Sequence, residues 1–240
     1  MKLFRLHADD CYVRIRQAGG KARLRPLGNC LFIGSLGFCL VSLLVFGIWA
    51  FAGGFLSRHL GEAGFYAACA IAFVGLSGAL FDRLVIDPNS LGRFYGLFTA
   101  SFIAYALLWC AAWFILRRPS SEWYGLLCGP RMAGLVGSLL GTLAMAAGLC
   151  AGFGNWQPFW KNALILFVTH TAGYFLGDLL FTWLRSEGAA QMLEGILSRP
   201  GRNFAAKLAW GFGYGLGFGL GMGHNLFVLQ VPLRKQLATP

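Results

Sequence analysis

Long apolar stretches dominate the pattern of the sequence. Six of them reach roughly the 20 residues that a helix needs to cross a bilayer core. They are residues 30–55, 64–81, 94–116, 132–153, 162–184 and 208–233. Lipid offers no hydrogen-bond partners to the backbone, and no stretch alternates between polar and apolar positions as a barrel strand does. The pattern therefore predicts an all-α, polytopic transmembrane helix bundle with six spans.

The remaining segments are short. We expect a basic N-terminal segment over residues 1–29, the transmembrane domain over residues 30–233, and a short C-terminal tail over residues 234–240. Residues 186–198 place apolar side chains on one helical face, which predicts an amphipathic helix in the membrane interface, ended by the Arg-Pro-Gly of residues 199–201. Residues 121–130 are too short to span and too apolar for a free loop, which suggests a re-entrant or interfacial segment.

Composition supports this class. Hydrophobic residues make up 57% of the chain and charged residues only 12%, whereas a soluble domain carries about 25% charged residues. This excludes an ordinary soluble enzyme and a disordered tail. The seven cysteines form no CxxC pair and show no metal-ligand spacing, so we expect them to act as small packing residues. All eight tryptophans lie towards the ends of the apolar stretches or just outside them, as in an interfacial aromatic belt.

The net charge of +11 arises at the ends of the apolar stretches, which indicates contact with a lipid bilayer rather than with nucleic acid. With the N-terminus inside, the inner segments carry 12 basic residues and the outer loops carry 8. The positive-inside rule therefore predicts that both termini are cytoplasmic. We expect an integral protein of a bacterial inner membrane.

Glycine is concentrated in the sixth stretch, where it occupies every second position from Gly211 to Gly223. At 100° per residue these glycines form two stripes on nearly opposite sides of a helix. The first stripe is Gly211, Gly215, Gly219 and Gly223, and the second is Gly213, Gly217 and Gly221. We expect matching small faces at Gly137 with Gly141 and at Gly173 with Gly177. Such stripes let helix backbones approach closely, so the sixth helix is predicted to be central.

A few polar residues lie inside the predicted spans, where ionisable groups are costly and often functional. Antiparallel fifth and sixth helices would place His170 and His224 at matching depth, where they could share a ligand, a proton or a metal. Tyr174 stands one turn from both His170 and Asp178, and Tyr214 falls at the depth of Asp178. The predicted polar seam between the two helices comprises His170, Tyr174, Asp178, Tyr214, His224 and Asn225.

Three interpretations of this seam remain open. In the first, the seam is a proton- or ion-linked transport path. In the second, His170 and His224 ligate a haem b. In the third, the polar side chains join the helices by structural hydrogen bonds. No cofactor is required by the pattern. The sequence also lacks HExxH and a Ser-His pair at helical spacing, which favours a non-enzymatic role.

Two functional hypotheses follow. In the first, the protein moves a small solute or ion with the titratable residues of the seam. In the second, it is a non-catalytic subunit or assembly factor of a larger membrane complex, including a pigment- or haem-bearing one. Its glycine faces would then dock partner helices or a second copy of the chain.

Overall fold

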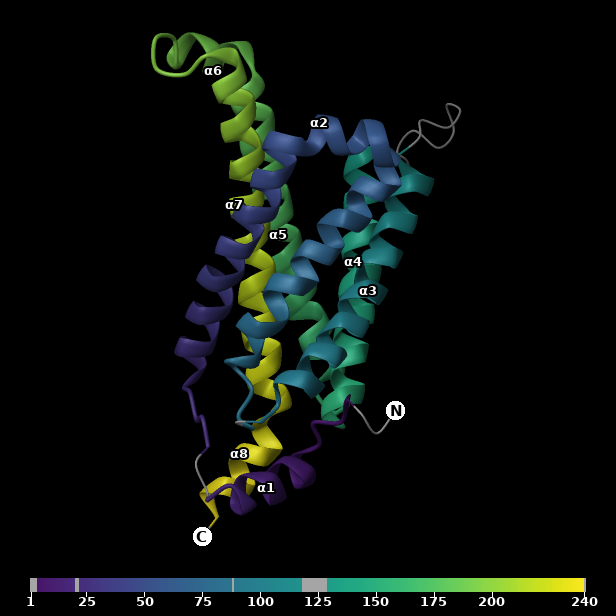
Figure 1. Ribbon diagram of the computed structural model, residues 1–240, viewed down its shortest axis with the longest axis vertical. Helices are drawn as coiled ribbons and strands as arrows, with labels where there is room; N and C mark the ends of the chain where they lie inside the picture. Colours follow the sequence, from purple (N-terminus) through teal and green to yellow (C-terminus); the bar gives the residue numbers. More distant parts are fainter. Residues whose placement is uncertain (1–3, 20–21, 88, 118–128, 240) are drawn as a thin grey trace.

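The computed structural model describes residues 4–19, 22–87, 89–117 and 129–239. These residues form eight α-helices and no strand, which confirms the all-α class. The helices are α1 Ala8–Gln17, α2 Leu27–Asp82, α3 Leu91–Leu116, α4 Pro130–Phe153, α5 Phe159–Arg185, α6 Glu187–Met192, α7 Arg199–Leu229 and α8 Val231–Ala238 (Figure 1).

Helix α2 folds back on itself. It consists of two helices that meet at a kink at Gly61, where φ is 68° and ψ is 176°. A side chain would be strained at this positive φ, whereas glycine adopts it at little cost. We call residues 27–60 the first arm and residues 62–82 the second arm. Figure 1 shows the first arm rising, the chain crossing the upper end of the bundle, and the second arm descending beside α3. The interval predicted as a loop between the first two spans is thus helical apart from this kink.

Four helices in the described part of the chain are long and apolar enough to cross a membrane, namely α2, α3, α4 and α5. The prediction of six separate spans is therefore supported only in part. Residues 30–55 and 64–81, predicted as two spans, lie on the two arms of α2, which counts once among these four helices. Helix α7, which contains the sixth, falls outside this group because glycine and polar residues dilute its apolar character.

The chain between the fifth and sixth predicted spans differs from expectation. The predicted amphipathic helix is reduced to the six-residue α6, capped by Ser186, whose hydroxyl accepts from the Ala189 amide. The Arg-Pro-Gly sequence begins α7 instead of ending a helix, since proline is tolerated in a first helical turn. Helix α7 ends at Leu229, before the predicted boundary at residue 233, and α8 begins at Val231 with Pro232 in its first turn. The segment predicted to be re-entrant lies mainly outside the described residues.

Helix α7 is the central element. It packs along its length against the first arm of α2 on one side and against α5 on the other, whereas α3 packs mainly on α4. Figure 1 shows α5 and α7 adjacent, with α3 and α4 on one side of them and the first arm of α2 on the other. In the same view the second arm of α2 lies between the first arm and the pair formed by α3 and α4.

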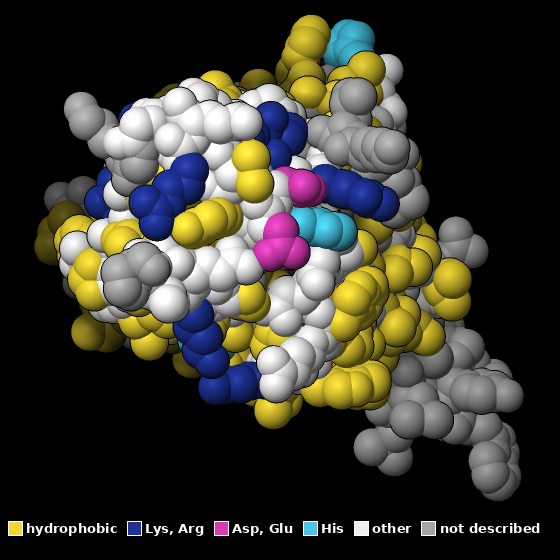
Figure 2. Space-filling model, turned by 90° about the horizontal axis from the view of Figure 1, so that it is seen from below, with side chains coloured by type: hydrophobic (Ala, Val, Ile, Leu, Met, Phe, Trp, Pro, Cys, Tyr) yellow, Lys and Arg dark blue, Asp and Glu magenta, His cyan; other side chains and the backbone are white. Residues whose placement is uncertain are grey.

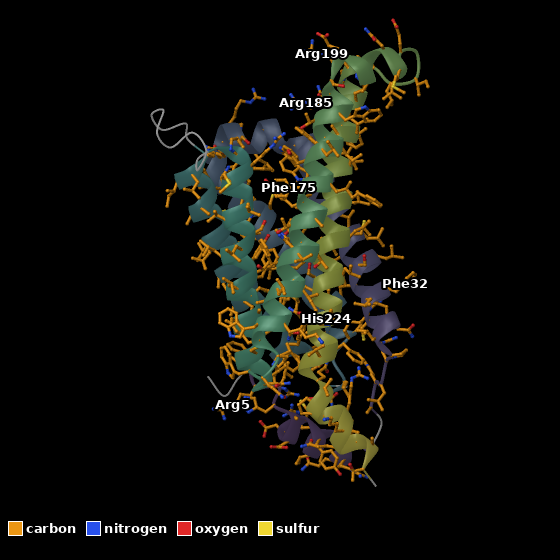
Figure 3. All side chains as sticks on the ribbon, turned by 180° about the vertical axis from the view of Figure 1, so that it is seen from behind. Arg5, Phe32, Phe175, Arg185, Arg199 and His224 are labelled. Carbon is orange, nitrogen blue, oxygen red and sulfur yellow. The ribbon has the colours of Figure 1, made fainter. Side chains whose placement is uncertain are left out.

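The outer faces of the bundle are apolar. Phe51 is 83% exposed, and Leu107, Leu164 and Leu179 are also largely exposed. Figure 3 shows Phe32 directed away from the bundle, in agreement with its 65% exposure. An apolar surface of this extent is unfavourable in water and favourable against lipid. The distribution therefore supports an integral membrane protein.

The end of the bundle that carries α1 and α8 is polar. The Gln236 amide donates to the Asp9 carboxylate at 2.6 Å and joins the two helices. Arg14 of α1 and Arg93 of α3 both donate to Asp87 Oδ2, at 2.7 and 3.0 Å. Burial raises the pKa of the Cys11 thiol to about 11, so it stays protonated at neutral pH. Figure 2 views this end and shows Lys and Arg side chains distributed around it.

Candidate functional site: an aromatic cavity beside a buried histidine

A buried cluster of three polar side chains joins three helices. His170 of α5 is 0% exposed, and its Nε2 shares a hydrogen bond of 2.8 Å with the hydroxyl of Tyr105 from α3. The same hydroxyl lies 3.4 Å from the hydroxyl of Tyr214 on α7. We call these residues the Tyr-His-Tyr cluster. It provides one titratable imidazole that is reached through a phenol.

Glycines position the members of this cluster. A Cβ on Gly141 of α4 would lie 2.6 Å from Cδ2 of Tyr105, so the absent side chain leaves room for the tyrosine ring. A Cβ on Gly213 of α7 would lie 2.7 Å from the carbonyl oxygen of Gly173 on α5. Because α5 and α7 touch through their backbones here, Tyr214 and His170 come within contact, with ring centroids 5.4 Å apart.

A cavity of about 590 Å³ adjoins the cluster. It is enclosed by both arms of α2 together with α3, α5 and α7. Tyr105 and Tyr214 form part of its wall, and His170 lies behind them. Aromatic side chains make up most of the lining: Phe46, Trp49, Phe65, Tyr66, Phe73, Phe102, Tyr105, Trp109, Trp113, Tyr174, Phe181, Trp210 and Tyr214. A volume of this size is within the range of small-molecule sites.

Several hydrogen-bond donors of the lining lack partners. The indole N–H groups of Trp109, Trp113 and Trp210 are buried and form no hydrogen bond with the described residues. A buried tryptophan N–H usually finds an acceptor, and leaving a buried donor unpaired is unfavourable. Glu62 also lines the cavity, but its two carboxylate oxygens accept from Arg117 at 2.5 and 2.7 Å. The buried indole nitrogens expose no surface to the cavity, and that of Trp109 lies against α4, where a Cβ on Gly137 would be 3.2 Å away.

The structure divides the predicted polar seam into two parts. Tyr174 lies in the upper part, where it stacks on His170 at 6.3 Å and lines the cavity. The hydroxyl of Tyr214 approaches Tyr105 rather than Asp178. Asp178 is partly buried and makes no hydrogen bond or ion pair with the described residues.

His224 and Asn225 belong to the lower part of the seam. His170 contacts Phe218, and His224 follows Phe218 by six residues, or about 9 Å along the axis of α7. The two histidines therefore do not face each other. Asn225 is fully buried, as is Asn162 of α5, and the side-chain amides of both lack hydrogen-bond partners among the described residues.

Both glycine stripes of α7 are covered within the chain. The first faces α2, where a Cβ on Gly215 would lie 2.6 Å from Cα of Cys39. The hydroxyl of Ser42 also donates to the Gly211 carbonyl at 2.7 Å across this interface. The second stripe faces α5, including both members of its predicted small face, Gly173 and Gly177. The other predicted face, Gly137 and Gly141, receives Trp109 and Tyr105 of α3 rather than α7.

Sequence reasoning did not identify the contribution of α3. Its residues Phe98, Phe102, Tyr105, Trp109 and Trp113 follow one another at spacings of three or four and therefore share one face of the helix. That periodicity was a usable signal for an aromatic wall. The hydrogen bond between Tyr105 and His170 had no such signal, because it joins residues 65 positions apart.

The described part of the chain contains no group of three or more His, Cys, Asp or Glu side chains placed to bind a metal ion. No protein-family model, curated protein sequence or solved structure matches the chain.

Proposed function

We propose that this protein is a multi-pass membrane protein that binds a small solute in the aromatic cavity and moves it together with a proton. The observation that carries the proposal is the contact between the cavity wall and a buried imidazole, since Tyr105 both lines the cavity and bonds to His170. An imidazole can accept a proton at one ring nitrogen and release one from the other. A phenol between the cavity and the imidazole provides a path for one proton.

The lining indicates the class of solute. An aromatic wall favours a flat or apolar body. A small aromatic carboxylate has such a body. As an anion it crosses a bilayer slowly without help, which gives a reason for a protein-mediated path.

The alternative role, as a subunit that docks partner helices through its glycine faces, receives less support. Both stripes of α7 are occupied by α2 and α5 of the same chain. A partner would have to bind the exposed apolar surface, which suits lipid equally well.

The proposal is tested in proteoliposomes that contain the pH-sensitive dye pyranine and receive radiolabelled benzoate at pH 8, where benzoate is almost fully ionised. We expect uptake with a linked change in luminal pH for the wild-type protein. His170→Gln should abolish the linked pH change, and Arg131→Gln, an exposed substitution on α4, should leave both signals intact. Equal uptake and equal pH traces in wild type and His170→Gln would contradict the proposal.

A further inference from the structure

Three arginines gather at the end of the bundle opposite α1 and α8. Arg185 is the last residue of α5, and Arg199 and Arg202 lie in the first turns of α7. Together with Asn203 they line a pocket of about 110 Å³. Figure 3 shows Arg185 and Arg199 near each other at this end, where the chain turns through α6. The pocket is separate from the aromatic cavity, since the two share no lining residue.

The arginines lack counter-ions within the described part of the chain. All ion pairs found there involve other residues, Arg14, Arg93 and Arg117, with Asp87 and Glu62. Glu187 and Glu194 occupy the connecting turn, yet neither lies within ion-pair distance of an arginine. Three like charges held around one pocket repel one another, and a bound anion would relieve this repulsion.

The donors available in the pocket fit a tetrahedral oxyanion. Arg202 Nε is buried without a partner, and the Nη1 of Arg202 makes only a long contact of 3.4 Å with the Leu197 carbonyl. Guanidinium groups bind phosphate oxygens in a bidentate manner. At ~30 Å³ per water molecule the pocket holds the equivalent of three or four waters, which is room for one phosphate group.

The surroundings of the pocket are amphipathic. Met192 and Ile196, between α5 and α7, are 72% and 75% exposed, and Trp183 is 44% exposed two residues before the end of α5. Exposed apolar and indole side chains beside a cluster of arginines are typical of a protein segment at the level of lipid headgroups. A phosphate group at this height could belong to a lipid or to a soluble molecule.

We propose that Arg185, Arg199, Arg202 and Asn203 form a binding site for the phosphate group of an anion, supplied by an anionic lipid headgroup or by soluble phosphate. The site holds this group at the end of the α5–α7 pair. It neutralises the repulsion among the three guanidinium groups, and it joins the end of α5 to the start of α7. This role does not depend on transport through the aromatic cavity.

The test uses the full-length protein, stripped of lipid in neutral detergent. Phosphatidylglycerol, phosphatidylcholine and inorganic phosphate are added separately, and bound molecules are counted by native mass spectrometry alongside the unfolding temperature. We expect phosphatidylglycerol or inorganic phosphate to bind and to raise the unfolding temperature. The double variant Arg199→Gln with Arg202→Gln should bind at least about tenfold more weakly, because charge-assisted hydrogen bonds are lost. Arg131→Gln removes the same charge from an exposed position at this end and should bind as the wild type does.

Competition identifies the source of the phosphate. If inorganic phosphate displaces the lipid, the site accepts soluble phosphate, and if it does not, the site requires a lipid headgroup. Arg185→Gln and Arg202→Lys extend the test should the double variant fail to fold, since Arg185 is exposed and lysine keeps the charge of Arg202 without its planar fork. Equal binding by the wild type and these variants, equal loss in Arg131→Gln, or no binding of either anion would overturn the proposal.

Discussion

The two long interfaces of this bundle are built in opposite ways. Where α7 meets α2 and α5, glycines bring the backbones into direct contact, as at Gly213 and Gly173. Where the second arm of α2 faces α5 and α7, large aromatic side chains hold the helices apart around a cavity of about 590 Å³. Tyr214 belongs to both regions, because it stands between glycines of α7 and also lines the cavity.

The difference shows how residue size sets the distance between helices. Small residues allow close packing, and dispersion contacts along the backbones then stabilise the interface without a hydrophobic effect, which is weak inside lipid. Aromatic side chains fill space unevenly and leave a volume between the helices. We therefore expect substitutions in the glycine interface to affect stability, and substitutions in the cavity to affect binding.

The largest effect on stability is expected for Gly215→Ala. The new Cβ would lie 2.6 Å from Cα of Cys39, so two helix backbones must separate. Overpacking of a core costs about 1–3 kcal/mol, and the loss should reach or exceed this range because the neighbouring atom cannot rotate away. The unfolding temperature in detergent measures the loss.

Gly47→Ala is the matched control for this substitution. It lies on the first arm of α2, and no atom lies within 4 Å of its added Cβ. Alanine favours a helix over glycine by up to about 1 kcal/mol, so this variant should be as stable as the wild type or slightly more stable. Similar losses in the two variants would show that close packing at Gly215 is not the cause.

An intermediate effect is expected for Tyr105→Phe. This change leaves Nε2 of His170 without its partner in a fully buried site, which costs about 1–3 kcal/mol. Tyr95→Phe removes a hydroxyl that donates to the Gly75 carbonyl in an exposed position, and it should cost less. Chemical or thermal unfolding of both variants compares the two losses, and a larger loss in Tyr95→Phe would argue against the buried hydrogen bond.

The smallest effect on stability is expected for Ala106→Phe. Ala106 lines the cavity, so a phenyl ring can occupy space that is already present. The unfolding temperature should change little, although the added group is far larger than the methyl introduced by Gly215→Ala. A loss as large as that of Gly215→Ala would show that the cavity is not open to an added group.

The sequence predicted the helical class and the central place of the glycine-rich helix, because both follow from local composition and periodicity. The stripes of α7 do contact α2 and α5 as helical geometry requires. The structure does not place His224 at the depth of His170, as the sequence suggested. That prediction assumed that each helix is centred on its apolar stretch. In the structure α7 begins at Arg199 and ends at Leu229, so its contacts with α5 differ from that assumption.

The cavity could not be predicted in this way. It depends on the kink at Gly61, which returns the second arm of α2 alongside α3, and on contacts between residues far apart in the chain. A glycine at position 61 is visible in the sequence, but its positive φ is a property of the folded chain. The separation between the helices likewise results from the packing of many aromatic rings together.

The most direct test of the cavity as a binding site is the quenching of tryptophan fluorescence by 4-bromobenzoate. Trp49, Trp109, Trp113 and Trp210 line the cavity, so a brominated occupant would lie against several indole rings. We predict saturable quenching in the wild type, with the saturable part absent in Ala106→Phe at an unchanged unfolding temperature. Quenching that is linear in probe concentration and identical in the two proteins would contradict the account.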